Sequence, residues 1–167
     1  MEYIYIGKIV DTHGIKGELR LISDFDFKDK VFKKNMQIYI GKDKKKETIT
    51  SYRPHKQYDM ITLDGYNDIN MVLGLLKENV YINQKDLELE RGEVLDSSLI
   101  GLQVYSIDDY LGEVIEIFKP SPNSKVIRFK KDDNFFLVPY VKTLIKDIEI
   151  HNKKIILHST EGVIKCE

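Results

Sequence analysis

Cationic and titratable side chains gather at two short links in the first half of the chain. The first link reads Thr-His-Gly-Ile-Lys-Gly and places His13 and Lys16 each just before a glycine, Gly14 and Gly17. Glycine supplies the backbone freedom that a tight bend needs, so both side chains are expected at a loop tip, outside the core. Such a loop suits contact with phosphate or with another protein. A G-x-x-G spacing alone also fits a plain turn with a solvated lysine.

The second link places Arg53, His55 and Lys56 around Pro54, just before an apolar run over residues 60–63. The proline ring fixes the backbone of the bend, so these three side chains are expected at the end of a strand. Phosphate binding and simple solvation of a strand end both fit this pattern. The lysine-rich residues 42–46 are expected to form a hairpin tip; keeping a sheet edge soluble and contacting RNA both fit this run.

The sequence lacks the spacings typical of a metal site or of a catalytic nucleophile. No two of the four histidines stand four residues apart, as helical metal ligands do. The single cysteine, Cys166, is the penultimate residue, which excludes an internal disulfide and a cysteine-rich zinc site. The acid pairs at residues 108–109 and 132–133 lie where turns are expected. We therefore expect no enzymatic activity, no metal and no cofactor.

Alternating apolar residues predict β-strands through most of the chain. The expected strands are Tyr3–Val10, Gly17–Ile22, Met36–Ile40, Glu47–Arg53, Asp59–Leu63, Asn79–Ile82, Leu102–Ile107, Glu113–Phe118, Lys125–Phe129, Phe135–Val138, Ile148–Ile150 and Lys154–Leu157. Many short strands at this spacing indicate an all-β fold built as small barrels or sandwiches. A helix is expected over Asn67–Lys77, with Asn67 as its N-cap. A shorter helical turn is expected after Pro139.

A loss of periodicity over Leu87–Ser98 marks the expected domain boundary, with Gly92 as a flexible point. We expect an N-terminal β-barrel domain over residues 1–90, a linker over 91–97 and a C-terminal domain over 98–167. Units of this size bury only ~60% of the surface of their unfolded chains, so each alone is marginally stable.

Charge is balanced in both halves of the chain. Residues 1–90 hold 15 basic and 15 acidic side chains, residues 91–167 hold 11 and 12, and the net charge is −1. Strong RNA binding by bulk charge is therefore not expected, although local contacts are. The start of the sequence lacks the features of a signal peptide, and no uncharged run approaches ~20 residues. We expect a cytoplasmic protein.

Five motifs, taken in order, resemble the ribosome maturation factor RimM family. They are I-G-K-I-V-D-T-H-G-I-K-G-E-L-R-L from Ile6, Arg53–Lys56, Ser98–Val104, Gly112–Val114, and the tail from Leu137 through V-P-Y-V to Gly162. The resemblance covers almost the whole chain. It implies two small barrels in tandem, a translation-factor-like N-terminal barrel and a PRC-type C-terminal barrel.

The resemblance also implies a function. It is a non-enzymatic role in assembling the head of the small ribosomal subunit, with processing of the small-subunit ribosomal RNA as its readout. The implied partners are the nineteenth small-subunit ribosomal protein and the immature subunit with its RNA. No membrane and no small-molecule substrate are expected.

Two sets of residues are expected to carry these contacts. The N-terminal set, for ribosomal RNA, comprises His13, Gly14, Lys16, Gly17, Arg53, His55 and Lys56. The C-terminal set, for the protein partner, comprises Val94, Leu95, Leu99, Ile100, Pro139, Tyr140 and Val141. The family commonly has a pair of aromatics where this chain has Val94-Leu95. Aliphatic side chains keep an apolar contact there but lose ring area.

Two rival functions are open at this point. One is a free-standing RNA-binding β-barrel protein, against which the balanced charge argues. The other is an enzyme that uses a PRC-type barrel as an accessory, against which the missing nucleophile–base pair argues.

Overall fold

The computed structural model describes residues 1–167, which divide into two compact units, Met1–Leu89 and Glu90–Glu167. The strands of the first unit are β1 (Tyr3–His13), β2 (Glu18–Ile22), β3 (Gln37–Ile40), β4 (Lys45–His55), β5 (Tyr58–Leu63) and β6 (Asn79–Asn83). Those of the second are β7 (Gln103–Ser106), β8 (Asp109–Ser121), β9 (Ser124–Lys131), β10 (Asn134–Pro139), β11 (Ile145–Glu149), β12 (Lys154–Leu157) and β13 (Ile164–Lys165). Every predicted strand has a counterpart, and the predicted all-β fold is confirmed. The short β13 was not predicted.

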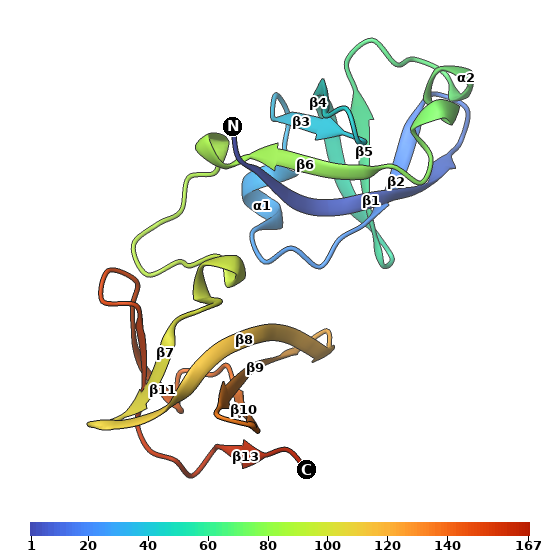
Figure 1. The fold of residues 1–167 in the computed structure, drawn as a ribbon. Helices are drawn as coiled ribbons and strands as arrows, with labels where there is room; N and C mark the ends of the chain where they lie inside the picture. Colours follow the sequence, from blue (N-terminus) through green and yellow to red (C-terminus); the bar gives the residue numbers. More distant parts are fainter. The chain divides into compact units, whose positions relative to one another are not determined.

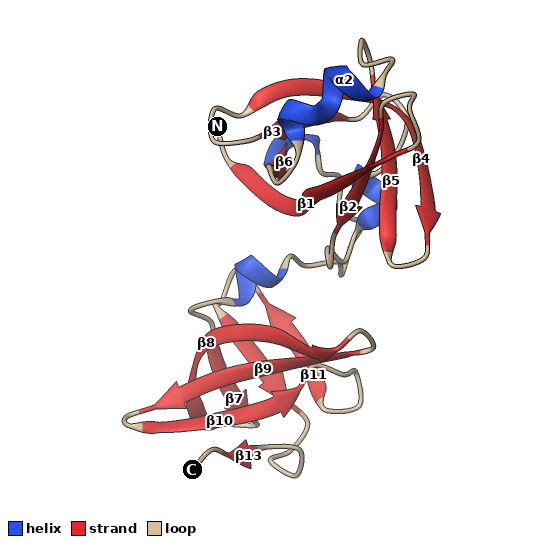
Figure 2. Cartoon of the chain, turned by 90° about the vertical axis from the view of Figure 1, so that its right-hand side faces the viewer, coloured by secondary structure: helices blue, strands red, loops and turns tan.

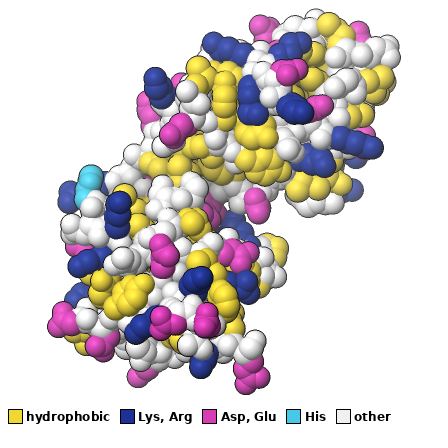
Figure 3. All heavy atoms as spheres, in the orientation of Figure 1, with side chains coloured by type: hydrophobic (Ala, Val, Ile, Leu, Met, Phe, Trp, Pro, Cys, Tyr) yellow, Lys and Arg dark blue, Asp and Glu magenta, His cyan; other side chains and the backbone are white.

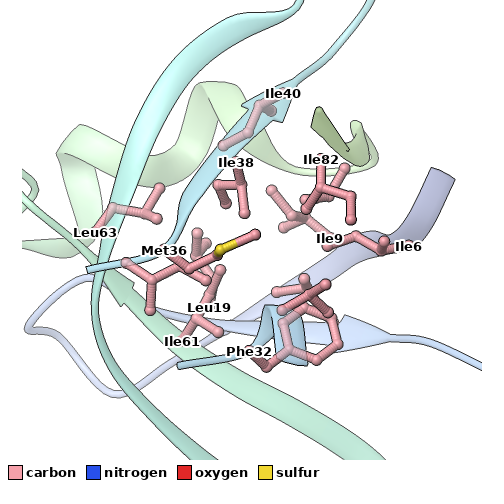
Figure 4. Close-up of a cluster of buried hydrophobic side chains, with 14 of the residues drawn as sticks. Ile6, Ile9, Leu19, Phe32, Met36, Ile38, Ile40, Ile61, Leu63 and Ile82 are labelled. Carbon is pink, nitrogen blue, oxygen red and sulfur yellow. The ribbon is translucent and has the colours of Figure 1, made fainter. Parts of the chain in front are cut away.

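The first unit is a closed barrel with the strand order β1-β2-β5-β4-β3-β6 (Figure 1). β1 closes it, because its first half pairs with β6 and its second half with β2. Aliphatic side chains that alternate along the strands fill the interior around Phe32 and Met36 (Figure 4). The outward side chains of the same strands are therefore free to form sites.

A buried carboxylate anchors α1 (Lys28–Val31), a helix that the sequence analysis missed. Asp59 of β5 is 3% exposed, and its carboxylate accepts a hydrogen bond from the Tyr52 hydroxyl at 2.7 Å. Its other oxygen lies 2.8 Å from the Lys28 ammonium. Burial and the bond to Asp59 raise the pKa of Tyr52, so its hydroxyl stays a donor. A single helical turn is too short to form alone, and these tertiary contacts hold it.

The helix predicted over Asn67–Lys77 is shorter than expected. It consists of α2 (Ile69–Val72) and a 3-10 turn, η1 (Leu73–Leu75). Its N-cap is Asp68 and not Asn67, because the Asp68 carboxylate accepts hydrogen bonds from the next backbone N–H groups, at 2.8 and 3.3 Å. Only Val72 of α2 is fully buried, so little apolar burial supports a longer helix. A further 3-10 turn, η2 (Gln84–Asp86), follows β6.

The second unit is a seven-stranded sheet with the order β11-β12-β7-β8-β9-β10-β13 (Figure 2). All its pairs are antiparallel except β12 and β7, which run parallel. The sheet surrounds a separate core that includes Leu99, Phe129 and Ile155. η3 (Asp96–Leu99) precedes β7 and contributes Leu99 to that core.

The helical turn predicted after Pro139 is an isolated hydrogen-bonded turn. The N–H groups of Leu144 and Ile145 donate to the carbonyl of Val141, at 3.1 and 3.0 Å. The chain then enters β11 at Ile145, earlier than predicted. Pairing with β12 from Ile145 onward stops the helical geometry after one turn.

Ile107, in the turn between β7 and β8, combines an unfavourable backbone with an exposed side chain. Its φ is +56°, and the side chain is 77% exposed. A left-handed backbone crowds Cβ against the carbonyl, and a β-branched side chain suffers most. The backbone strain at this turn therefore lowers the stability of the fold, and the exposed side chain offsets little of that loss.

We predict that Ile107→Asn stabilises the protein by about 1 kcal/mol, because asparagine tolerates the left-handed region. Urea denaturation followed by circular dichroism measures the change in the free energy of unfolding. Ile107→Val keeps the branch at Cβ and is the matched control, with an expected change below about 0.5 kcal/mol. An asparagine variant no more stable than the valine variant would contradict the prediction.

Candidate nucleic-acid interface

The link between β1 and β2 holds the first set of predicted residues at the barrel surface. Gly14 and Gly17 have φ of +68° and +92°. A Cβ on Gly17 would lie 2.7 Å from the carbonyl oxygen of Tyr66, so glycine is required there by space as well as by φ. The Ile15 carbonyl accepts a hydrogen bond from the Ile69 N–H at 2.9 Å. The link is therefore fixed, with the Lys16 side chain exposed.

The turn between β4 and β5 holds the second set. His55 pairs with Tyr58 across a two-residue turn that begins at Lys56, whose φ is +56°. Pro54 lies in β4 beyond the residues that pair with β3, so its missing N–H leaves no hydrogen bond unmade on that side. Lys56 is exposed at the tip.

The two links come together on one outer face of the barrel. β2 pairs with β5 and β5 with β4, and the imidazole rings of His13 and His55 lie 5.7 Å apart, centroid to centroid. Six side chains on this face form the basic cluster: His13, Lys16, Arg20, Arg53, His55 and Lys56. Residues more than thirty positions apart in the sequence thus form one surface.

Arg20 is a member of the cluster that the sequence analysis missed. One of its terminal nitrogens lies 2.7 Å from Nδ1 of His13, and another lies 3.7 Å from the Asp11 carboxylate. A guanidinium can only donate, so His13 Nδ1 accepts and the neutral ring carries its proton on Nε2. The guanidinium also lies over the ring of Tyr58, 5.5 Å from its centroid. The sequence signal was alternation, which puts Glu18 and Arg20 of β2 on the same outer face.

Glu18 neutralises Arg53, one of the predicted RNA-binding residues. Nε and Nη2 of Arg53 donate to the two carboxylate oxygens at 2.9 and 2.7 Å, in a bidentate pair. This hydrogen bonding holds the pKa of Glu18 below its ordinary value and raises that of Arg53. Arg53 therefore offers less free charge to a phosphate than its sequence position suggested.

The free positive charge of the cluster lies on its lysines. Neither Lys16 nor Lys56 forms an ion pair, and both are exposed. Partial burial lowers the pKa of His55, and the nearby Arg53 and Lys56 act in the same direction. His55 is thus a neutral hydrogen-bonding group at pH 7, beside two accessible ammonium groups.

A surface hollow of about 430 Å³ adjoins the cluster. His13, Gly14, Ile15, Lys16, Glu18 and Thr62 line it. Ile15 is 74% exposed, so the link presents an apolar side chain beside the lysine. The hollow can receive a flat or apolar group while Lys16 meets a phosphate.

The C-terminal set of predicted residues separates into buried and exposed members. Leu99 is 0% and Leu95 9% exposed, and Leu99 belongs to the core of the second unit. Leu99 therefore packs the core, and neither Leu99 nor the buried Leu95 is available as a surface contact, which corrects the place of both in the predicted set. Ile100 and Val141 are 48% and 43% exposed.

Val94, Pro139 and Tyr140 are partly buried, and Val94 and Tyr140 pack against the second core. The ammonium of Lys125 lies 2.9 Å from the Asp96 carboxylate and 5.3 Å from the centroid of the Tyr140 ring. The Tyr140 N–H donates to the Lys125 carbonyl at 2.9 Å. η3 and the corner after β10 therefore meet at the start of β9.

No group of three or more histidine, cysteine, aspartate or glutamate side chains is placed to hold a metal ion. None of the helices has the length and apolar character needed to cross a membrane. Basic and acidic side chains lie interspersed over the face in Figure 3.

Comparisons with known proteins place the chain in a family. Residues 4–87 match the model of the RimM N-terminal domain, and residues 91–164 match that of the PRC-barrel domain. The chain is 38% identical to the ribosome maturation factor RimM of Ligilactobacillus salivarius, over 98% of this chain and 99% of that protein. It is 35% identical to the ribosome maturation factor RimM of Bacillus pumilus, over 98% and 97%.

A solved structure of the N-terminal domain of RimM from Thermus thermophilus matches with a TM-score of 0.46 and 19% identity, covering 53% of this chain and 98% of that one. The two family models together span nearly the whole chain, and the curated relatives agree with both. The resemblance predicted from the motifs is confirmed: the chain belongs to the RimM family of ribosome maturation factors.

Proposed function

We propose that this protein assists maturation of the head of the small ribosomal subunit without catalysing a reaction. In this proposal the N-terminal unit binds ribosomal RNA and the C-terminal unit binds the nineteenth small-subunit ribosomal protein. The RNA-binding part of the proposal rests on the basic cluster, in which Lys16 and Lys56 extend from two links on one barrel face. Free ammonium groups at fixed positions suit phosphate contacts.

In this proposal, ion pairing decides which residues supply affinity for RNA. Lys16 and Lys56 have no acidic partner, whereas Arg53 is held by Glu18. A lysine that releases counterions from a phosphate adds affinity, but an arginine already paired must first lose its carboxylate. The two lysines are therefore the main electrostatic contacts, and the histidines add neutral hydrogen bonds.

The protein half of the proposal rests on two exposed aliphatic side chains, Ile100 and Val141. Ile100 follows η3, and Val141 follows the corner where Pro139 fixes the backbone. A contact on fixed backbone costs little ordering entropy when it forms. Exposed acids such as Asp108 and Asp109 would speed encounter with a basic protein.

A free-standing RNA-binding protein is the alternative function. It would need a strong positive field, and the acids Glu18 and Asp11 inside the N-terminal site reduce that field. Steep salt dependence with naked RNA, equal in affinity to binding of immature subunits, would favour the alternative.

Replacing both free lysines, Lys16→Gln and Lys56→Gln, should weaken binding to immature small subunits. Each lost phosphate contact should also reduce the slope of log affinity against log salt by about 0.7 to 1. Co-sedimentation at several salt concentrations measures both effects. Lys33→Gln with Lys34→Gln, two exposed lysines outside the cluster, is the matched control. Equal binding by both double variants would refute the assigned RNA site.

Ile100→Ser and Val141→Ser should each weaken binding to the purified nineteenth small-subunit protein by about 1–3 kcal/mol if each is an anchor of the interface. Titration calorimetry with the full chain gives the dissociation constants. Ile164→Ser, at a residue 63% exposed in the same unit, is the control for loss of apolar surface. Because all three side chains are exposed, the variants should fold normally. Wild-type affinity in both test variants would exclude this surface.

A further inference from the structure

Four tyrosines gather on the outer face of the N-terminal barrel, over β1, β6 and β3. Tyr3 and Tyr5 face outward because they alternate with inward isoleucines of β1. Tyr5 lies opposite Tyr81 of β6, and Tyr81 lies opposite Tyr39 of β3. We call these four residues the tyrosine cluster. Their spacing along the chain does not predict that they come together.

The rings pack edge to face in two pairs. The ring centroids of Tyr3 and Tyr39 are 5.1 Å apart, and those of Tyr5 and Tyr81 are 5.9 Å apart. Tyr39 is only 7% exposed, whereas Tyr3 is 36% and Tyr5 49% exposed. The inner rings therefore support two outer rings that keep a large area in contact with solvent.

Positive charge lies directly beside these rings. The Lys44 ammonium is 4.1 Å from the ring centroid of Tyr81 and 5.6 Å from that of Tyr3. Lys44 belongs to the turn between β3 and β4, where residues 42–46 hold four lysines and one aspartate. Lys45 contacts Tyr66 and Glu47 instead, but Lys42 and Lys46 are exposed and form no ion pair.

Exposed aromatic rings next to a row of cations match the requirements of single-stranded RNA, whose bases stack and whose phosphates need positive charge. A tyrosine hydroxyl is uncharged near pH 7, and burial raises the pKa of Tyr5 further, with Asp24 and Tyr81 acting in the same direction. An apolar protein surface would fit less well, because binding it would desolvate the lysines without neutralising them.

We propose that this face binds single-stranded RNA, with unpaired bases stacked on Tyr3 and Tyr5 and phosphates beside the lysines of the β3–β4 turn. The site is distinct from the basic cluster, since Tyr3 and His13 stand at opposite ends of β1. An extended strand of that length spans roughly 30 Å. The proposal deepens the function proposed above by giving the N-terminal unit a second RNA-binding surface.

The test is binding of the full chain to a labelled oligouridylate of about ten nucleotides, a length within the range that small barrels bind. Fluorescence anisotropy gives the affinity. The chain has no tryptophan, so tyrosine dominates its fluorescence, and the difference in quenching between wild type and the variants reports stacking on the replaced ring. Tyr3→Leu and Tyr5→Leu should each weaken binding about tenfold and reduce the quenching, as expected when one stacking contact is lost.

Three controls separate stacking from other effects. Tyr5→Phe keeps the ring and should bind within about twofold of wild type. Lys42→Gln should reduce the salt slope by about 0.7, the value for one phosphate of a single strand. Tyr110→Leu removes a tyrosine of similar exposure, 39%, from the second unit and should change nothing.

Wild-type affinity in Tyr5→Leu, or an equal loss in Tyr5→Phe, would overturn the proposal. A Tyr5→Leu variant that binds the oligouridylate normally but no longer binds the nineteenth small-subunit protein would overturn the proposal in favour of a protein-binding surface. A different result would refute the RNA site proposed for the basic cluster. If the double variant at Lys16 and Lys56 binds immature subunits normally while Tyr5→Leu loses the oligouridylate, the basic cluster is refuted and the tyrosine cluster stands.

Discussion

Closure of the N-terminal barrel through β1 is the constraint on which both proposed RNA surfaces depend. β1 pairs with β6 along its first half and with β2 along its second. Alternation then decides which side chains fill the barrel and which face solvent, with Ile6 inside and Tyr5 outside. A one-residue slip of β1 against β6 would bury tyrosine and expose isoleucine. The hydrophobic core therefore fixes the positions of the surface groups that bind.

The number of charges along the chain does not predict where free positive charge lies, because ion pairing decides which charges are free. The N-terminal half has equal numbers of acids and bases. Glu18 holds Arg53 and Asp59 holds Lys28, so several acids are occupied within the fold. Lys16, Lys42 and Lys56 stay free at turns. A balanced net charge thus coexists with local positive sites, which limits unspecific attraction to RNA while it preserves contacts at fixed places.

Strands and family were readable from the sequence because both depend on local patterns. Alternation located the strands, and ordered motifs located the family. The features that the sequence did not predict depend on contacts between residues that are far apart in the sequence. α1 is held by Lys28, which reaches the buried Asp59 thirty-one positions away, and by Val31, which is buried in the barrel core. Leu99 looked like a surface contact beside Ile100, but the second core buries it. The tyrosine cluster joins three strands and has no signature along the chain.

Two of the strained backbone positions coincide with proposed RNA contacts. Lys44 and Lys56 adopt positive φ, at +54° and +56°, at turns that carry such contacts, whereas Lys77 and Lys153, at +70° and +55°, carry none. Asparagine or glycine would suit that backbone better, but neither carries charge. A lysine at such a turn lowers the stability of the fold, but the rigid hairpin holds its ammonium group outward. The same reasoning separates these turns from that of Ile107, where the side chain is aliphatic and no proposed contact offsets the cost.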